Sequence, residues 1–577
     1  MHDTVLSRLW AHARNRPSGV AATFLADGER EEHSQSYAQL VEAAAGIGRF
    51  IRSRQLNGAL IAIALPSGLG FLQALIGCMC GGAIPVPIAV PRLGAESKGV
   101  ERLCRIVSDC GAKLLIAEGS MVDALREVAR TRDDLSSVEI VAMSAASIDG
   151  IPREEDFAPN PEAIAFLQYT SGSTANPRGV VVRHRNLVAN FAVLEKSMQI
   201  DDSTRFLSWL PLHHDMGLIG IVIQALFRGC ALVLMSPFHF MQRPMRWLEA
   251  ISRFQATLSG GPNFAYDLCV DRIGRRSAEP LDLSCWKVAF NGSEPVRAVT
   301  MESFSRAFTP SGFRPDSFFP CYGLAEATLY VSGEGYRAAT ITSFDAPALS
   351  LGSGVEPQVG NKHIRLVSAG TPGQDHEVVV ADPATCAIQV DGAVGEILVR
   401  GPSVTDGYWR PTSESRQTFD AEIQGRTDKY LRTGDLGFLR HGRVFVTGRL
   451  KDLIIVRGRN IYPQDVESSA GVEFDQERSG LAAAFSERTH DGEESLTVVR
   501  EVRARDVHEL QKLAARIAER VLIDHDIRAR RVVLVRIGSL PRTSSGKIRR
   551  SETRRALAVG QILPIVDWGL HAMRAGY

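Results

Sequence analysis

An uncharged stretch from residue 57 to residue 91 constrains the fold more than any other feature of this sequence. Its length exceeds the roughly 20 residues that a helix needs to cross a bilayer. It is interrupted, however, by helix-breaking residues at Pro66, Gly68, Gly70, Gly81, Gly82, Pro85 and Pro87. The segments between them predict a strand, a helix and a second strand, each buried on both sides. We therefore expect part of a buried parallel sheet here, and no membrane insertion.

The remainder of the first 150 residues also alternates between strand-like and helix-like patterns. Ser36 is expected to cap a helix, and further helices are expected over residues 100–110 and 121–130, with short strands around Leu114 and Ile140. Such alternation predicts an α/β fold in which helices cover mostly parallel sheets. No residue of this region suggests chemistry, so we interpret it as structural core.

The segment YTSGSTANPRGV, from Tyr169 to Val180, lies between two apolar β-branched runs. It predicts a strand, a small-residue loop and a second strand. Hydroxyls, open backbone amides and one cation suit the oxygens of a polyphosphate, and the residues that supply them are Thr170, Ser171, Gly172, Ser173, Thr174 and Arg178. The competing interpretation is an ordinary solvated loop. It is not a Walker-type loop, because no GxxxxGK[ST] string occurs in the chain.

Six further motifs follow this loop in order: WLPLHHDMGLIG from Trp209, FNGSEPVRA from Phe290, YGLAEATLYVSG from Tyr322, LRTGDLG from Leu431, VTGRLKDLIIVRGRN from Val446 and LPRTSSGKIRR from Leu540. In residues, order and spacing, nearly the whole chain resembles the adenylate-forming superfamily of acyl-CoA synthetases, luciferases and peptide-synthetase adenylation domains. HDMGLIG, FNGSEPVRA, YGLAEATLYVSG and RGRNIYPQDVE most resemble the fatty acyl-AMP ligases. Those enzymes activate fatty acids for carrier proteins rather than for coenzyme A.

The resemblance implies an ATP site built from several of these motifs. It assigns to the edge of the adenine the turn formed by Asn291, Gly292, Ser293 and Glu294. Tyr322 offers a flat face for stacking on the base, and it is followed by Gly323, Leu324 and Ala325. The resemblance also makes Asp435 and Arg449 a ribose clamp, although an aspartate after a glycine is, on its own, most often a turn residue.

Four residues receive catalytic or mechanical roles from the same resemblance. His214 is expected beside the reacting carboxylate and phosphate, and Lys547 is expected to neutralise the charge that develops there. Glu326, a carboxylate in an apolar run, is expected to coordinate the Mg²⁺ that accompanies ATP, with a structural ion pair as the alternative. Lys451 matches the hinge about which the family's small C-terminal domain swings. His213 is expected to have no role, and the His213–His214 pair is not expected to chelate zinc, because adjacent residues of an extended chain point to opposite sides.

The expected domain organisation has two parts. Residues 1–450 form the large N-terminal domain, including a β-rich subdomain with strands at HEVVVAD, AIQVDG and GEILVRG. Residues 451–577 form a small mobile α/β lid, with a helix near residues 507–522. The helix-poor segment 331–370 lies where fatty acyl-AMP ligases carry an insertion. By resemblance, this insertion packs on the N-terminal domain and is associated with rejection of coenzyme A.

Composition excludes several other classes of protein. The 577 residues carry 66 Lys and Arg against 65 Asp and Glu, so no charge surplus suggests a nucleic acid or an acidic membrane surface as partner. The nine cysteines contain no CxxC pair, which favours a reduced cytoplasm over disulfides or a zinc site. Charged and apolar residues alternate from Met1 to Arg14, so no signal peptide is expected.

The predicted reaction is attack of a fatty carboxylate on the α-phosphorus of MgATP, followed by acyl transfer to the phosphopantetheine thiol of an acyl carrier protein. No carrier domain is apparent in the sequence, so we expect the carrier in trans, in lipid, polyketide or lipopeptide biosynthesis. Two departures from the family's TGxPKG loop, Ala175 and Arg178, predict reduced but present activity. The competing hypotheses are a fatty acyl-CoA synthetase and a catalytically weak adenylate- or partner-binding protein.

Overall fold

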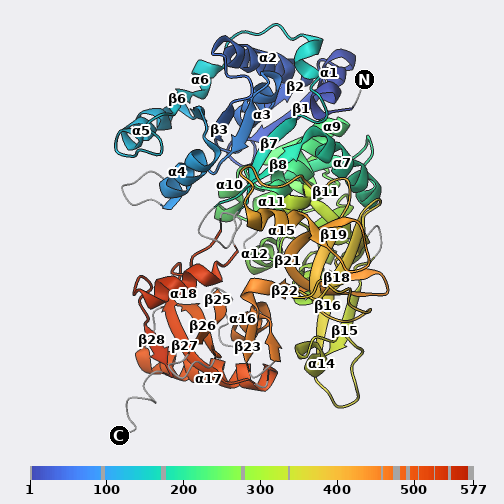
Figure 1. The fold of residues 1–577 in the computed structure, drawn as a ribbon, viewed down its shortest axis with the longest axis vertical. Coiled ribbons are helices and arrows are strands. Elements are labelled where there is room, and N and C mark those ends of the chain that lie inside the picture. The colour runs from blue at the N-terminus through green and yellow to red at the C-terminus, as the bar shows by residue number, and fades with distance from the viewer. Residues whose placement is uncertain are drawn as a thin grey trace.

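The computed structural model describes residues 3–91, 98–170, 177–273, 280–334, 338–456, 459–471, 481–488, 494–503, 506–525, 527–543 and 547–569. Figure 1 shows the blue, green and yellow parts of the chain gathered in one large body. The elements from Ile454 onward, orange to red, form a smaller body at its lower end. The chain therefore has the α/β organisation that the sequence predicts.

The uncharged stretch forms the expected strand, helix and strand. These are β3 (Leu60–Ala64), α3 (Leu69–Cys80) and β4 (Ile84–Pro87). β3 lies between β4 and β5 (Leu114–Ala117), and β6 (Glu139–Ala142) completes a fully parallel four-stranded sheet. All five residues of β3 are buried, because α3 and its neighbours cover the sheet.

Helices of this region begin and end close to the predicted positions. Ser36 caps α2 (Tyr37–Ser53) through a reciprocal capping box with Gln39. The predicted helices are α4 (Lys98–Cys110) and α5 (Gly119–Arg130), and α1 (Val5–Asn15) packs against α2. Local capping and apolar spacing thus suffice to place these elements.

A nine-stranded sheet forms the centre of the large body. Its five parallel pairings join β1, β10, β9, β11, β12 and β13, and antiparallel strands lie at both edges. In spatial order the strands are β17 (Thr371–Pro372), β14 (Tyr330–Gly333), β13 (Phe318–Gly323), β12 (Val288–Asn291), β11 (Leu258–Gly261), β9 (Arg205–Ser208), β10 (Ala231–Met235), β1 (Val20–Leu25) and β2 (Glu32–Ser36). The helices that cover it include α7 (His184–Met198), α10 (Pro237–Gln242), α11 (Met245–Phe254), α12 (Asn263–Arg272) and α13 (Ala298–Phe308).

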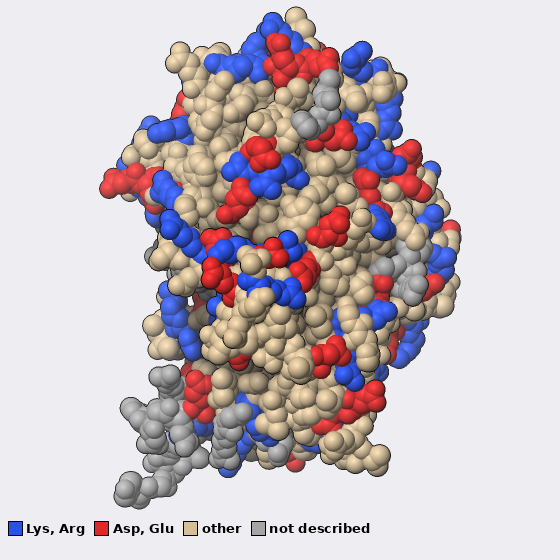
Figure 2. Space-filling model, turned by 45° about the vertical axis from the view of Figure 1, so that its right-hand side comes forward, with Lys and Arg blue, Asp and Glu red and all other residues tan. Residues whose placement is uncertain are grey.

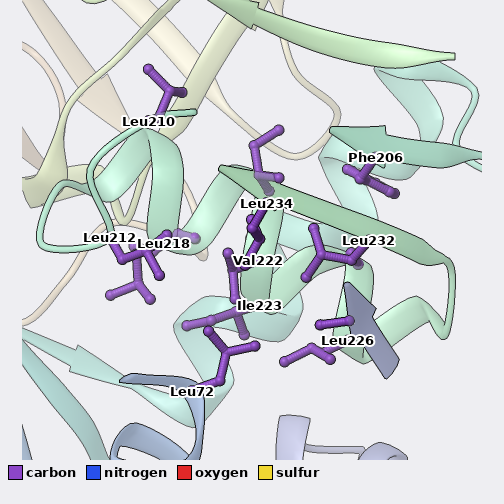
Figure 3. Close-up of a cluster of buried hydrophobic side chains, with 14 of the residues drawn as sticks. Leu72, Phe206, Leu210, Leu212, Leu218, Val222, Ile223, Leu226, Leu232 and Leu234 are labelled. Carbon is purple, nitrogen blue, oxygen red and sulfur yellow. The ribbon is translucent and has the colours of Figure 1, made fainter. Parts of the chain in front are cut away.

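The apolar segment GLIGIVIQALF, which follows the histidine pair, does not form one continuous α-helix. It is divided into α8 (Asp215–Gly217), a π-helical segment η2 (Leu218–Ile223) and α9 (Gln224–Arg228). Figure 3 shows side chains of this segment directed toward those of β9 and β10 in a common buried cluster. π-helical turns are rare and frequently occur at functional sites, and only the short helix α8 separates this one from His214.

An aromatic cluster anchors the far side of the sheet. Trp286 is fully buried and packs edge-on against Trp247 (ring centroids 5.2 Å apart), Phe304 (6.1 Å) and Phe313 (5.3 Å). Its indole Nε1 donates a hydrogen bond to the Val288 carbonyl at 2.9 Å. Truncating this ring would leave a cavity and remove this buried hydrogen bond.

We expect Trp286→Ala to lower the free energy of unfolding by about 3–5 kcal/mol, the range typical of a buried aromatic ring. Denaturant unfolding of the full chain measures this change. Val299→Ala is the control, because Val299 is 54% exposed on α13, and it should change stability by no more than about 0.5 kcal/mol. Equal stability of the two variants would contradict the assignment of Trp286 to the core.

The β-rich region contains β18 (Glu377–Ala381), β19 (Gly395–Arg400), β20 (Ala421–Glu422), β21 (Lys429–Arg440) and β22 (Arg443–Arg449). The prediction of a strand at AIQVDG is wrong: this segment makes only an isolated bridge between Ala381 and Ile388. Asp435 lies within β21, paired with Arg449 of β22, rather than in a turn after a strand. Cross-strand pairing, which local sequence does not specify, decides both differences.

The segment 331–370 forms a hairpin in its described part. β15 (Ile341–Asp345) and β16 (His363–Val367) pair antiparallel on either side of α14 (Ala346–Ser350). Phe344 packs edge-on against Phe438 and Phe445 of the β-rich region at 5.0 and 5.1 Å. The hairpin also touches the C-terminal part, where Arg459 donates to Ser350 Oγ at 3.4 Å.

The C-terminal part has its own cores. Its elements are β23 (Ile454–Val456), β24 (Arg459–Ile461), α16 (Pro463–Gly471), β25 (Ala482–Arg488), β26 (Glu494–Val502), α17 (Val507–His525), β27 (Ala529–Arg536), α18 (Arg550–Ala558) and β28 (Val566–Trp568). α17 lies where the sequence predicts a helix. Strands β25 to β28 form one four-stranded sheet in chain order.

The surface has no dominant sign of charge on the face that Figure 2 draws, where positive and negative side chains are interspersed. Within the described ranges, no helix has both the length and the apolar character needed to cross a bilayer.

Candidate active site

The adenine-side turn, residues 291–294, and the aromatic residue Tyr322 lie at the same edge of the central sheet. β12 and β13 run parallel, with Asn291 opposite Pro320, so Asn291 and Tyr322 lie toward their carboxyl ends. Ser293 in the turn has φ +75°, a left-handed conformation that is uncommon for a residue other than glycine. Such strain concentrates at functional sites, which agrees with a binding role for the turn.

Tyr322, Asp435 and Arg449 form a connected chain of polar contacts. The Tyr322 hydroxyl donates to Asp435 Oδ2 at 2.8 Å, and Arg449 Nε lies 3.1 Å from Asp435 Oδ1. The Asp435 amide donates to Thr433 Oγ1 at 3.1 Å, which orients the aspartate. Burial and the Asp435 charge raise the pKa of Tyr322 well above its ordinary value, and Asp435 raises the pKa of Arg449. The structure thus brings Tyr322 together with Asp435 and Arg449, which lie more than a hundred positions further along the chain.

Glu326 occupies a short 3-10 turn, η5 (Ala325–Ala327), which also contains Ala325 and follows Gly323 and Leu324. Its Oε1 accepts a hydrogen bond from the Tyr408 hydroxyl at 2.8 Å, and its carbonyl accepts from the Thr405 amide at 2.9 Å. Thr328, just after it, has φ +67°. No ion-pair partner of Glu326 occurs among the residues that the structure describes, so the structural ion pair weighed from sequence is not found there.

The phosphate loop is described only at its two ends. β7 (Ile164–Tyr169) and β8 (Gly179–Arg183) pair antiparallel, and the Thr170 amide donates to the Arg178 carbonyl at 3.1 Å. The Arg178 guanidinium carbon lies 5.3 Å from the centre of the Tyr408 ring, which links this end of the loop to Glu326. The residues that fall outside the described ranges include the predicted phosphate ligands Ser171, Gly172, Ser173 and Thr174, and also Ala175.

The two histidines lie in a turn rather than on an extended strand. Their rings are 4.5 Å apart, so the sequence argument that they point to opposite sides is wrong. The described residues contain no group of three or more His, Cys, Asp or Glu side chains suited to hold a metal. Burial lowers the pKa of His213 to about 3 and holds the pKa of His214 well below its ordinary value. Both imidazoles are therefore neutral at pH 7.

Lys547 enters the same site from the C-terminal part of the chain. Its backbone is held by Thr543, which donates its amide to the Lys547 carbonyl at 2.8 Å and accepts from the Lys547 amide through Oγ1 at 3.0 Å. Burial and the nearby Arg449 lower the pKa of Lys547, whereas three carboxylates raise it: Glu294, Asp215 and Asp435. These carboxylates come from three separate segments of the large body, so the lysine lies where the segments converge.

We expect the rate of acyl-adenylate formation to decrease at alkaline pH. The midpoint of this decrease should lie below about 10.4, the pKa of an ordinary lysine. Because the pKa of Lys547 is lowered, its positive charge is lost as pH rises through a value below that of an ordinary lysine. His214 should produce no loss near pH 6.5, because its pKa lies well below that value. A pH–rate profile measures both effects.

Lys547→Arg is the informative variant for this profile, because an arginine keeps its charge throughout the range. The alkaline loss should move to higher pH in this variant. An unchanged alkaline limb would assign it to another group.

Lys451 lies in the 3-10 turn η6 (Leu450–Asp452), which directly follows Arg449 at the end of β22. Burial and the charge of Arg449 lower its pKa. Lys451 therefore lies in the chain between β22, which ends at Arg449, and Ile454, where the first strand of the C-terminal part begins.

Two residues of the site were not assigned from sequence. Tyr408, which contacts both Glu326 and Arg178, comes from the GYW string and carried no recognisable signal. Asp215 directly follows His214; burial raises its pKa, and the Lys547 charge opposes this. A charged residue in an apolar segment, the signal used for Glu326, applies equally to Asp215 and would have identified it.

Comparison with known proteins places these features in context. The family model described as AMP-binding enzyme matches residues 9–409. A medium-chain-fatty-acid–[acyl-carrier-protein] ligase of Moorena producens, JamA, is 37% identical over 566 residues, covering 96% of this chain and 94% of that protein.

Solved structures agree with these sequence matches. A fatty acyl-adenylate ligase from Legionella pneumophila, solved with acyl adenylate and pyrophosphate, is 36% identical and superposes with a TM-score of 0.74, covering 98% of this chain and 97% of that one. A structure from a study of fatty acyl-adenylate ligases of E. coli and L. pneumophila gives a TM-score of 0.85 at 29% identity, covering 97% and 98%.

Proposed function

Because the chain belongs to the AMP-binding enzyme family, we propose that it activates a fatty acid as the acyl-adenylate and passes the acyl group to an acyl carrier protein. The fatty carboxylate attacks the α-phosphorus of ATP, pyrophosphate leaves, and the phosphopantetheine thiol of the carrier then displaces AMP. The observation that carries this proposal is the convergence of Lys547 with the Tyr322–Asp435–Arg449 chain in one site.

Positioning and charge neutralisation are what such a reaction requires of the protein. Tyr322 supplies the stacking face, and the Asp435 carboxylate suits the two ribose hydroxyls. Lys547 stabilises the charge on the reacting carboxylate and α-phosphate, and neutral His214 hydrogen-bonds beside them. The phosphate loop, with Arg178 at its end, binds the departing pyrophosphate.

Mg²⁺ fits this site as a metal held mainly by phosphate oxygens and water. Glu326 is a carboxylate whose Oε1 is oriented by Tyr408, and no cluster of three protein ligands accompanies it in the described part of the chain. One carboxylate together with substrate phosphates is the usual way in which proteins hold Mg²⁺. The bound ion would neutralise phosphate charge.

We expect Glu326→Gln to raise the Mg²⁺ concentration for half-maximal acyl-adenylate formation about tenfold or more, as loss of a charged ligand predicts. A titration of Mg²⁺ at fixed ATP measures it. Glu302→Gln is the control, since Glu302 lies on α13 and pairs with Arg365 of β16. The Mg²⁺ dependence of this variant should match that of the unmodified protein. An unchanged Mg²⁺ requirement in Glu326→Gln would exclude this carboxylate as a ligand.

We also propose that residues 451–577 act as a lid that turns about Lys451 after adenylation. This movement would withdraw Lys547 and admit the carrier thiol. Each part has a core of its own, which supports such a movement, and the hairpin within 331–370 contacts both parts.

Detection of acyl-AMP and pyrophosphate after incubation of the purified chain with MgATP and fatty acids of graded length tests the first step. Acyl-AMP with at least one chain length is the expected result. Nucleotide binding without pyrophosphate release would support a binding protein instead.

A further inference from the structure

Asn263, the first residue of α12, ties the adenine-side turn to that helix through four hydrogen bonds. Its amide N–H donates to Glu294 Oε1 at 3.0 Å, and its Nδ2 donates to the Pro295 carbonyl at 2.9 Å. Its Oδ1 accepts from the Arg297 amide at 3.1 Å and from Asn291 Nδ2 at 3.2 Å. Asn263 is only 1% exposed, so these bonds are shielded from water.

This network fixes which way the Asn291 amide points. The Pro295 carbonyl can only accept and the Arg297 amide can only donate, so the Asn263 side chain has a single satisfactory orientation. In that orientation Asn263 Oδ1 faces Asn291, so Asn291 must donate to it through its NH₂ group. The Oδ1 of Asn291 is therefore directed away from Asn263.

Asn291 Oδ1 is a buried acceptor without a partner among the described residues. Asn291 is fully buried, and an unsatisfied acceptor in such a position is costly and therefore uncommon in native proteins. Because Asn291 pairs with Pro320 in parallel register, its side chain lies on the same face of the sheet as that of Tyr322, two residues further along β13. The free acceptor is thus on the face where the base stacks.

We propose that Asn291 Oδ1 accepts a hydrogen bond from the 6-amino group of adenine and that Asn263 is the positioning residue that holds it there. This deepens the proposed function and rests on it. Among purine nucleotides, only those with a donor at position 6 satisfy the acceptor. The pair therefore selects ATP over inosine triphosphate, whose position-6 oxygen would face another oxygen, and over purine riboside triphosphate, which has only a hydrogen there.

The test compares kcat/KM for these three nucleotides in acyl-adenylate formation by the full chain. The unmodified protein should prefer ATP by about tenfold or more, as expected when a buried polar group loses its partner. Asn263→Ala should reduce that preference to about threefold or less, because the Asn291 amide is then free to rotate.

Two variants separate this effect from general damage. Asn263→Asp keeps the oxygen that holds Asn291 Nδ2 and should retain most of the preference. Thr300→Ala removes a different link between α12 and the region after the turn, the 2.9 Å bond to Asp267 Oδ1, and should leave the preference unchanged even where it lowers the rate.

Direct binding of the three nucleotides, measured by calorimetry on the same proteins, makes the inference independent of turnover. A preference for ATP that is lost in Asn263→Ala supports the inference even if no acyl-AMP forms, a result that would reject the proposed function alone. Equal use and equal binding of ATP and inosine triphosphate by the unmodified protein would overturn the inference, as would a full ATP preference in Asn263→Ala.

Discussion

Lys547→Ala should lower the rate of acyl-adenylate formation by about 10²–10³-fold, the loss that follows removal of a single transition-state charge stabiliser. Lys547, from the C-terminal part, is coupled electrostatically to Glu294, Asp215 and Asp435 of the large body. Pyrophosphate release with saturating fatty acid and ATP measures the effect.

The matched control is Arg555→Ala, which removes an exposed cation of the same C-terminal segment. It should retain the rate within about twofold, because exposed charges contribute little. Transfer from supplied acyl-AMP to a holo carrier should survive in Lys547→Ala, which would show that the variant is folded. Retention of adenylation by Lys547→Ala would remove this residue from the mechanism.

Asp435→Ala should lower kcat/KM for ATP by about 10²-fold, since bonds to a charged carboxylate each contribute roughly 1.5–3 kcal/mol. The variant removes the group that fits the ribose hydroxyls, and it also leaves Arg449 and the Tyr322 hydroxyl without their shared partner. Steady-state kinetics with varied ATP measure the loss.

Tyr322→Phe separates the two roles of this cluster. It keeps the ring that stacks on adenine and removes only the hydroxyl that orients Asp435, so a decrease of about tenfold or less is expected. Asp391→Ala removes a more exposed aspartate that pairs with Arg440, and it should have no effect on ATP. A Tyr322→Phe loss as large as that of Asp435→Ala would contradict a direct role for the carboxylate.

The sequence predicts elements well where local signals are complete. The breakers around residues 57–91 and the cap at Ser36 are such signals, and both correspond to observed element boundaries. The alternating pattern of AIQVDG predicts a strand that does not form, because the fold supplies only a single bridge at Ile388. Partners in a sheet are a property of the tertiary structure.

In the candidate site, too, some features can be predicted from local motifs and others are visible only in the fold. Motif resemblance identifies Asp435, Arg449 and Lys547 individually, whereas only the fold shows that one carboxylate serves both Tyr322 and Arg449. Asn263 gave no signal in SGGPN beyond a turn and a helix start. Its significance comes from bonds to residues about 30 positions away, which no local pattern encodes.

Transfer of the activated acyl group tests the account most directly. Purified protein is incubated with MgATP and a fatty acid that it adenylates, with coenzyme A in one reaction and holo acyl carrier protein in the other. The account predicts that acyl-AMP persists in the reaction with coenzyme A. In the reaction with holo acyl carrier protein, acyl-AMP should be consumed to form the acyl-carrier thioester. Formation of acyl-CoA at a comparable rate would contradict it and identify a fatty acyl-CoA synthetase.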